Sequence, residues 1–466
     1  MESSDIERRP AGADTANASP PQSGRPARHL SIFDAVCVVV GIVVATGIFK
    51  SPQLVAANTA GPWSMLGAWA FGGFLCFCGA LTYADLAAAC PGFGGEYLYL
   101  SRSLGRGVGF LFVWARMTVI QTGAIAALAY VFGVYMVRLT GGQAHEVTYW
   151  ALASVVVLTT LNAIGLHVGK FMQNVLTAAK VAGLVAIAVL GLTLGEAPTS
   201  GGASPTGSAG PFGLAMVFVL YTYGGWNEAA YVAAELRGRR GRNMLWVLVV
   251  GIVLITLLYL GVNVAYLSTL GFEGIRASDV AAAEAMAAVF GPSGAAAVSV
   301  LVAVAALGAI DGCIFTGARA IHAWGNDYPA FGLLGRWSRR LGSPVAALVA
   351  QEVIAVVLVL LPALSETLRT SLGGGFELAV AYTAPVFWAF LLLTGVCVFV
   401  LRLRRRATIG PLGRWVPMVT AAILCATCGY MIYSSIAYAR KAALLGVGVL
   451  AAGVPVYLLV RSRRET

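Results

Sequence analysis

The sequence predicts an all-α integral membrane protein with about twelve transmembrane helices, two of which are interrupted near their middles. Of the 466 residues, 59% are hydrophobic and only 11% are charged. The mean hydropathy is +0.81. A soluble domain of this length carries far more charge, so lipid is the predicted solvent of this chain.

Apolar runs long enough to cross the hydrocarbon core recur along the chain. The predicted spans are residues 31–57, 62–90, 105–137, 147–166, 171–194, 211–236, 243–270, 294–324, 344–362, 376–401, 412–433 and 440–460. Residues 1–29 are polar and lack the apolar centre of a signal peptide, which predicts a disordered cytoplasmic tail. The stretch 198–211 is rich in Gly, Ser, Thr and Pro, as expected of a flexible outer loop after the fifth span.

The orientation follows from the basic residues, because Lys and Arg in short loops stay on the cytoplasmic side. With the N-terminus inside, most of the 31 Lys and Arg residues fall in cytoplasmic segments. The outer loops hold only Arg138, Arg276, Arg369, Arg440 and Lys441. Both termini are therefore predicted to be cytoplasmic. The net charge of +11 is interpreted as a topology signal, and no nucleic-acid partner is predicted, because the basic residues do not form one patch.

Little in the sequence favours an enzyme. The four histidines are widely separated, and no Gly-rich phosphate loop with its lysine is present. Cys425 and Cys428 have the spacing of a redox or metal pair, but they lie in an apolar run without His or carboxylate neighbours. Packing is the favoured role for them. We predict no metal and no cofactor.

The first span is interrupted at residues 45–52, Ala-Thr-Gly-Ile-Phe-Lys-Ser-Pro. Gly47 permits non-helical backbone angles, and Pro52 suits the first turn of a resumed half-helix. A half-helix that begins here would direct unpaired N–H groups and the positive end of its dipole into the protein. A carboxylate is the natural ligand for such a group.

The sixth span is interrupted at residues 221–227, Tyr-Thr-Tyr-Gly-Gly-Trp-Asn. Gly224 and Gly225 are expected to end a half-helix and to leave carbonyls around Tyr221 to Tyr223 that accept from an ammonium group. Paired breaks in the first span of each half point to a midplane site that fits the zwitterionic head of an amino acid. The alternative is ordinary glycine kinks, since the chain contains 56 glycines.

Several motifs together resemble a known family. They are Thr46–Phe49 with Ser51 and Pro52, Pro91–Tyr97, Ile120–Gly123, Gln173–Lys180, Tyr223–Asn227 and Asn263–Tyr266. They are similar to motifs of the amino acid-polyamine-organocation superfamily, and most similar to those of its L-type amino acid transporter branch. The resemblance covers nearly all of residues 30–460.

The resemblance implies sodium-independent transport or exchange of L-amino acids, with neutral ones favoured, by alternating access across a plasma membrane. It implies one inverted repeat at 30–197, an extracellular loop at 198–210, a second repeat at 211–401, two further helices at 402–461 and a short tail at 462–466. By position, the substrate carboxylate would be held by Thr46, Gly47 and Ile48, and its amino group by backbone at Tyr221, Thr222 and Gly224. Tyr221 matches a gating aromatic, and Trp226 and Asn227 would border the side-chain pocket. The alternative for Tyr221 and Trp226 is a lipid-facing or core position.

Lysine can lose its proton when buried, and a charge at bilayer depth is a candidate functional group. Lys180 matches a fifth-span lysine of the family that replaces a sodium ion, so we expect it to hydrogen-bond carbonyls near Gly41 to Ala45. Snorkelling to the cytoplasmic surface is the alternative.

Lys50 and Glu228 each stand a few residues past a helix break, where the family often has apolar residues. They would form an ion pair that locks the outer gate, or Glu228 would bind a cationic side chain or a coupled proton, or both would face a wet vestibule. Asp311 is a second carboxylate candidate for proton coupling, or it bonds within the packed interior. Arg116 and Arg319 have no partner that the sequence identifies.

A secondary amino acid transporter is thus the leading hypothesis, with a proton-coupled transporter of cationic amino acids or polyamines as the alternative and a channel or sensor as a different class. The expected partners are the amino acid and the lipid bilayer. In animal relatives of the L-type branch, a cysteine between the third and fourth spans links to a glycoprotein subunit. The loop Leu139–Val147 has none. We therefore expect no disulfide-linked heavy subunit, and we expect a bacterial inner-membrane protein.

Overall fold

The computed structural model describes residues 31–44, 46–90, 95–164, 170–195, 210–232, 236, 240–338, 340–364, 375–404, 412–438 and 440–465. The predictions made for the tail 1–29, for most of the loop 198–210 and for Ala45 lie outside these residues.

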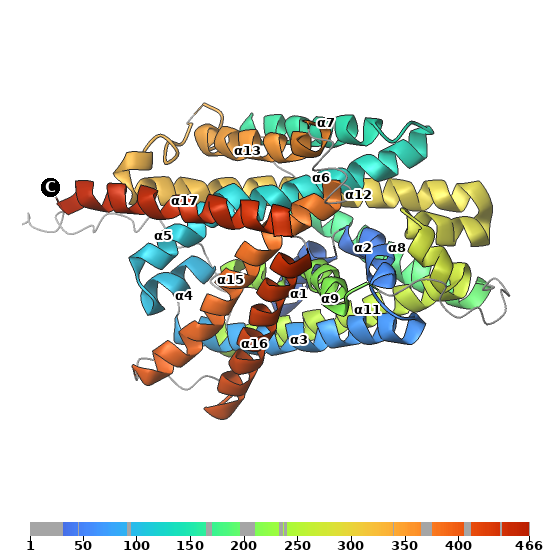
Figure 1. The fold of residues 1–466 in the computed structure, drawn as a ribbon, viewed down its shortest axis with the longest axis horizontal. Helices are drawn as coiled ribbons and strands as arrows, with labels where there is room; N and C mark the ends of the chain where they lie inside the picture. The colour runs from blue at the N-terminus through green and yellow to red at the C-terminus, as the bar shows by residue number, and fades with distance from the viewer. Residues whose placement is uncertain are drawn as a thin grey trace, which may run out of the picture.

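Helices make up almost all of the described chain (Figure 1). In chain order they are α1 (Ile32–Val43), α2 (Gly47–Ala57), α3 (Pro62–Ala89), α4 (Gly95–Ser103), α5 (Arg106–Ala115), the π-helix η1 (Arg116–Ile120), α6 (Gln121–Thr140), α7 (Glu146–Ala163), α8 (Lys170–Leu194), α9 (Phe212–Thr222), the 3₁₀-helix η2 (Trp226–Glu228), α10 (Ala229–Val232), α11 (Arg240–Ala277), α12 (Ala281–Asp327), the 3₁₀-helix η4 (Pro329–Phe331), α13 (Val345–Leu364), α15 (Gly375–Leu403), α16 (Trp415–Tyr438) and α17 (Arg440–Glu465).

The all-α membrane class is confirmed. In the described ranges, nine helices are long and apolar enough to cross a membrane, and the bent pair α1 and α2 makes up to ten. The predicted spans 147–166 and 211–236 are not among these helices; α7 has 18 residues, and α9 has 11 before its break. The layout of twelve spans therefore stays a prediction.

Two of the longest helices are kinked at a glycine. Gly271 in α11 has φ 68° and ψ 172°, and Gly291 in α12 has φ 65° and ψ −155°. Glycine adopts this left-handed backbone without a steric penalty. The predicted spans fit these kinks, because one ends at residue 270 and the next begins at residue 294. The short helical segments between the two kinks thus form a connection outside the spans.

The third span contains a π-helical segment. The N–H of Gln121 donates to the carbonyl of Arg116, five residues earlier, at the end of η1. The Tyr382 hydroxyl on α15 donates to the carbonyl of Thr118 at 2.8 Å. Such π-bulges widen a helix locally and often occur at functional sites.

The broken helices lie at the centre of the molecule. Figure 1 shows α1, α2 and α9 enclosed by longer helices, and α2 packs on both α9 and α11. Fully buried aromatic rings fill the space beside them: the ring centroid of Tyr259 lies 5.7 Å from that of Trp69 and 5.0 Å from that of Tyr223. The packed core therefore surrounds the breaks and holds them in place.

Candidate functional site

The two predicted breaks are present and lie against each other. Between α1 and α2 the chain bends by 47°. After α9 ends at Thr222, Gly225 takes a left-handed conformation with φ 104°. A Cβ placed on Gly47 would lie 3.0 Å from the Thr222 hydroxyl oxygen, and one on Gly225 would lie 2.8 Å from the Ile42 side chain. Glycine at both positions therefore permits the close approach of the two breaks.

One tyrosine joins the ends of the two half-helices. The hydroxyl of Tyr259 on α11 lies 2.9 Å from the carbonyl of Val43, the last residue of α1, and 3.2 Å from the carbonyl of Thr222, the last residue of α9. The Thr222 hydroxyl also donates to the Ser51 hydroxyl at 2.7 Å. The Tyr259 hydroxyl thus shares its one hydrogen between two carbonyls that have no helical partner at a helix end, and the Thr222–Ser51 contact links α9 to α2.

The N-terminus of α2 presents unpaired donors. The N–H of Phe49 bonds to the carbonyl of Thr46 at 3.1 Å, but the N–H groups of Gly47 and Ile48 precede the first helical hydrogen bond. Thr46 is fully buried, and among the described residues its hydroxyl has no hydrogen-bond partner. A buried polar group without a partner is costly and marks a place where a ligand can bind.

Pro52 corrects the prediction for this half-helix. Because α2 already begins at Gly47, Pro52 lies inside the helix and not in its first turn. Proline has no N–H group, so the carbonyl of Ile48 lacks its helical donor. The break and the proline together weaken the backbone hydrogen bonding of residues 46–52.

The carbonyls of the sixth break each have one partner. The carbonyl of Tyr221 accepts from the N–H of Gly224 at 2.9 Å, and that of Thr222 accepts from Tyr259. A carbonyl oxygen has a second lone pair, so both groups keep acceptor capacity. The half-buried Tyr221 ring meets Phe376 on α15 edge to face, at a centroid distance of 5.9 Å.

Trp226 and Asn227 point toward α3 and α4. The Trp226 ring packs on Tyr83 of α3 at 4.9 Å, and it borders an apolar cavity that is also lined by α3, α15 and α16. The accessible volume of that cavity is about 10 Å³, enough for at most one water. The core alternative for Trp226 therefore fits its contacts. Asn227 donates to the Glu96 carboxyl at 3.1 Å.

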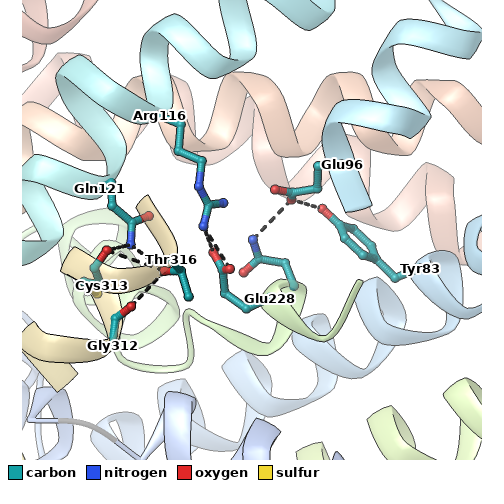
Figure 2. A network of polar contacts seen from close by, with 9 residues as sticks. Tyr83, Glu96, Arg116, Gln121, Glu228, Gly312, Cys313 and Thr316 are labelled. Carbon is teal, nitrogen blue, oxygen red and sulfur yellow. Dashed lines mark hydrogen bonds and ion pairs between the residues drawn. The ribbon is translucent and has the colours of Figure 1, made fainter. Parts of the chain in front are cut away.

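Lys50 and Glu228 each pair with another residue and not with one another. Lys50 donates to Asp279 at 2.8 Å, in the connection between α11 and α12, and to Gln53 at 3.0 Å. Arg116 on η1 donates to both oxygens of Glu228, at 2.8 and 2.9 Å (Figure 2). The predicted pairing of the two fails because their helices place them beside closer partners, and Arg116 acquires the partner that the sequence did not identify.

Asp311 and Arg319 bond within the helix bundle. The Asn162 amide on α7 donates to Asp311 at 2.6 Å, which supports the interior alternative for that carboxylate. Arg319 donates to the carbonyl of Phe315 at 3.3 Å, with its guanidinium over the Phe315 ring.

Lys180 is 2% exposed and is on α8, which packs on α1. Thr177 lies one turn earlier on α8 and packs closely against Gly41 of α1. A Cβ added to Gly41 would lie 2.3 Å from the hydroxyl oxygen of Thr177. Within the described ranges no hydrogen bond links the ammonium to the carbonyls of α1, and Ala45 is outside them. Its role therefore stays a prediction.

Sequence reasoning missed Glu96 and Asp279. Glu96 lies in the quoted motif Pro91–Tyr97, yet its proximity to Arg116 and Glu228 comes from the packing of α4 on α10. Asp279 carries no pattern of its own. No signal in the sequence could have paired it with a lysine 229 positions away.

Comparison with known proteins gives a consistent picture. Residues 30–459 match the family described as "Amino acid permease". The b(0,+)-type amino acid transporter 1 of Mus musculus is 28% identical over 420 residues, which cover 87% of this chain and 82% of that protein. The serine/threonine exchanger SteT of Bacillus subtilis (strain 168) is 26% identical over 446 residues, 94% of this chain and 98% of that protein. The cystine/glutamate transporter of Homo sapiens is 23% identical over 441 residues, which cover 93% of this chain and 85% of that protein.

Proposed function

The chain belongs to the amino acid permease family, within the amino acid-polyamine-organocation superfamily, and we propose that it transports or exchanges neutral L-amino acids. Transport would proceed by alternating access and would not require sodium. The observation that carries this proposal is the N-terminus of α2, where the buried Thr46 hydroxyl lacks a partner among the described residues. The N–H groups of Gly47 and Ile48, which precede the first helical hydrogen bond, lie next to it in the chain. Amino acid transport and exchange are also the activities in the names of the relatives.

The substrate carboxylate would bind at Thr46, Gly47 and Ile48. Unpaired N–H groups and the positive end of the helix dipole favour an anion there. The amino group would lie across the junction, where the Tyr221 and Thr222 carbonyls keep a free lone pair. Because the breaks are in contact, one small zwitterion can meet both sets of groups. Tyr221 would cover it, and the side-chain pocket would extend toward Gly224, Trp226 and Asn227.

Neutral substrates fit better than cationic ones. Glu228, the carboxylate that would receive a cationic side chain, is already neutralised by Arg116 at 2.8 Å. Asp311 is held by Asn162. The alternative, a proton-coupled transporter of cationic amino acids or polyamines, would require one of these contacts to open first.

Sodium independence rests on Lys180. A buried ammonium on α8 next to the end of α1 would repel a sodium ion in that region. The fixed positive charge would then support the end of α1 in place of the cation.

The two repeats would be 30–197 and 211–401, with α16 and α17 added after them. The bias of Lys and Arg toward one side supports cytoplasmic termini. The connection 141–145 between α6 and α7 contains no cysteine, which supports function without a disulfide-linked heavy subunit. Similarity to a bacterial relative over 98% of its length supports a bacterial inner membrane as the location.

The test is counterflow of a labelled amino acid panel in proteoliposomes, with and without sodium. Neutral L-amino acids should exchange at the same rate in both conditions. Thr46→Val, which removes the hydroxyl and keeps the shape, should raise the KM about tenfold, since a hydrogen bond to a charged group contributes about 1.5–3 kcal/mol. Thr140→Val at the exposed end of α6 is the matched control. An unchanged KM for Thr46→Val would reject the carboxylate site, and exchange that requires sodium would reject the role of Lys180.

A further inference from the structure

A buried carboxyl group that the proposed substrate site does not use lies beside the sixth break. Glu96 is on α4, the connecting helix between the spans α3 and α5 to α6, and is 5% exposed. Its Oε1 accepts hydrogen bonds from the Asn227 amide at 3.1 Å and from the Tyr83 hydroxyl (Figure 2). Both donors are neutral, so nothing in these contacts compensates a full negative charge.

The charges around Glu96 do not balance if it is ionised. Figure 2 shows Arg116 and Glu228 next to it, and the Arg116 guanidinium donates two hydrogen bonds to the Glu228 carboxylate. Arginine does not lose its proton in proteins. With both carboxylates ionised, the described residues Arg116, Glu228 and Glu96 would carry a net charge of −1 in a buried place. With Glu96 protonated, the cluster is neutral.

The hydrogen bonds of Glu96 also indicate which of its two carboxyl oxygens would carry the proton. In the described part of the chain, both hydrogen bonds to Glu96 end on Oε1. In a protonated carboxyl group, one oxygen is a carbonyl with two lone pairs and the other carries the hydrogen. Two donors on Oε1 match the carbonyl oxygen, which leaves Oε2 to carry the proton.

We propose that Glu96 is a proton-binding site that couples amino acid exchange to proton movement, an inference that rests on the transport function proposed above. When Oε2 releases its proton to water on the cytoplasmic side, the new carboxylate competes with Glu228 for Arg116. That competition weakens the contact between η1 and η2, and with it the closure of the sixth break. Return of the proton restores the contact. One proton moves per cycle, and the O–H bond of Glu96 is the one covalent bond that breaks and forms again.

The acidity of Glu96 supports this assignment. Burial raises the pKa of Glu96 to about 7, with a further increase from the Glu228 carboxylate, against the lowering effects of the Tyr83 hydrogen bond and the Arg116 charge. Besides Tyr83, Arg116 and Glu228, the described titratable groups near Glu96 include Tyr99 on α4, Cys90 after α3 and Cys397 on α15. Burial raises the pKa values of Tyr99 and Cys90, so both stay neutral near pH 7. Of Glu96, Tyr99 and Cys90, Glu96 is the group whose charge changes in this range.

The experiment measures substrate counterflow and lumenal pH together, in proteoliposomes that contain a pH-sensitive dye. The wild-type protein should move protons when a neutral amino acid is added. Its exchange should also depend on pH with a midpoint near 7, where the protonated fraction of such a group falls about tenfold between pH 6 and pH 8. Glu96→Gln cannot release the proton that weakens the contact between Arg116 and Glu228, so it should lose the proton movement, exchange substrate more slowly than the wild type and become insensitive to pH. Glu273→Gln, an exposed carboxylate beside Arg276, should behave as wild type.

The outcomes separate the two proposals. Counterflow without proton movement in the wild type, or proton movement that persists in Glu96→Gln, would overturn this inference alone. Absence of counterflow in the wild type would overturn the transport function and this inference with it. If Glu96→Gln does not fold, Tyr83→Phe provides the test: it removes a hydrogen bond that lowers the Glu96 pKa, so the midpoint of the exchange profile should shift upward. An unchanged midpoint would overturn the assignment.

Discussion

The ion pairs on the two sides of the broken helices differ in depth. Lys50 and Asp279 pair at the predicted outer side, where the two side chains are 8% and 75% exposed. Arg116 and Glu228 pair at the predicted inner side, where the side chains are 5% and 22% exposed. An exposed pair contributes about 0–1 kcal/mol, whereas loss of one partner from a buried pair costs about 3–5 kcal/mol. Breaking the inner pair is therefore expected to need another interaction that offsets the lost free energy, whereas breaking the outer pair is not.

The strongest way to break this comparison is to remove the inner cation. Arg116→Ala removes the cation that is hydrogen-bonded to the Glu228 carboxylate, so we expect a loss of about 3–5 kcal/mol of stability and a loss of transport. Thermal unfolding in detergent and counterflow in proteoliposomes measure the two effects. The double variant Arg116→Met with Glu228→Gln should recover most of the stability, because neither charge remains. A melting temperature of Arg116→Ala equal to that of the wild type would contradict the ranking of the two pairs.

Removing the third buried cation sharpens the comparison, because Lys180 has no hydrogen-bonded partner within the described ranges. Lys180→Ala should leave the protein folded and reduce exchange by about tenfold, equivalent to 1.4 kcal/mol in the barrier. Exchange rate and melting temperature are measured together. Lys441→Ala, at the exposed start of α17, is the matched control. An unaffected rate in Lys180→Ala would reject its role.

The junction between the two pairs gives a smaller effect. Tyr259→Phe removes the hydroxyl that bonds the last carbonyls of α1 and α9, at 2.9 and 3.2 Å, and should cost about 1 kcal/mol. The substrate KM and the melting temperature should both report the loss. Tyr433→Phe, on an exposed part of α16, controls for removal of a hydroxyl. Equal values for Tyr259→Phe and wild type would show that the two carbonyls do not depend on this bond.

The outer pair should give the smallest effect. The hydrogen bond from Lys50 lowers the pKa of Asp279 in the connection between α11 and α12. A lowered carboxyl pKa stabilises the folded state above the unfolded value of about 3.9, and that contribution is lost as the pH falls through the lower folded value. Asp279→Asn should therefore change the stability by less than about 1 kcal/mol at pH 7, and the change should become smaller as the pH falls through the lowered pKa of Asp279. A large loss at pH 7 would show that exposure does not separate the two pairs.

The sequence predicted the breaks well and the charge partners poorly, for a physical reason. A break depends on local residues such as Gly47 and Gly225, whose backbone freedom can be read from neighbours in the chain. A partner depends on how distant helices pack: Arg116 meets Glu228 across 112 positions. The start of α2 was predicted within a few residues. The position of Pro52 was predicted wrongly, because it depends on the exact residue at which the break ends and α2 begins. The role of Lys180 was predicted from the family resemblance. The structure shows that Lys180 is buried, but its role stays a prediction.

The π-helical segment Arg116–Ile120 has one further consequence. A π turn contains one residue more than an α turn, so it acts as a single-residue insertion that sets the rotational phase of the third span. Each residue of an α-helix advances the chain by about 100° around the axis. Deletion of one residue from this segment would thus swing the Arg116 side chain by roughly a quarter turn relative to α6. The alignment of the guanidinium with the sixth break therefore depends on the number of residues in this turn as well as on their identity.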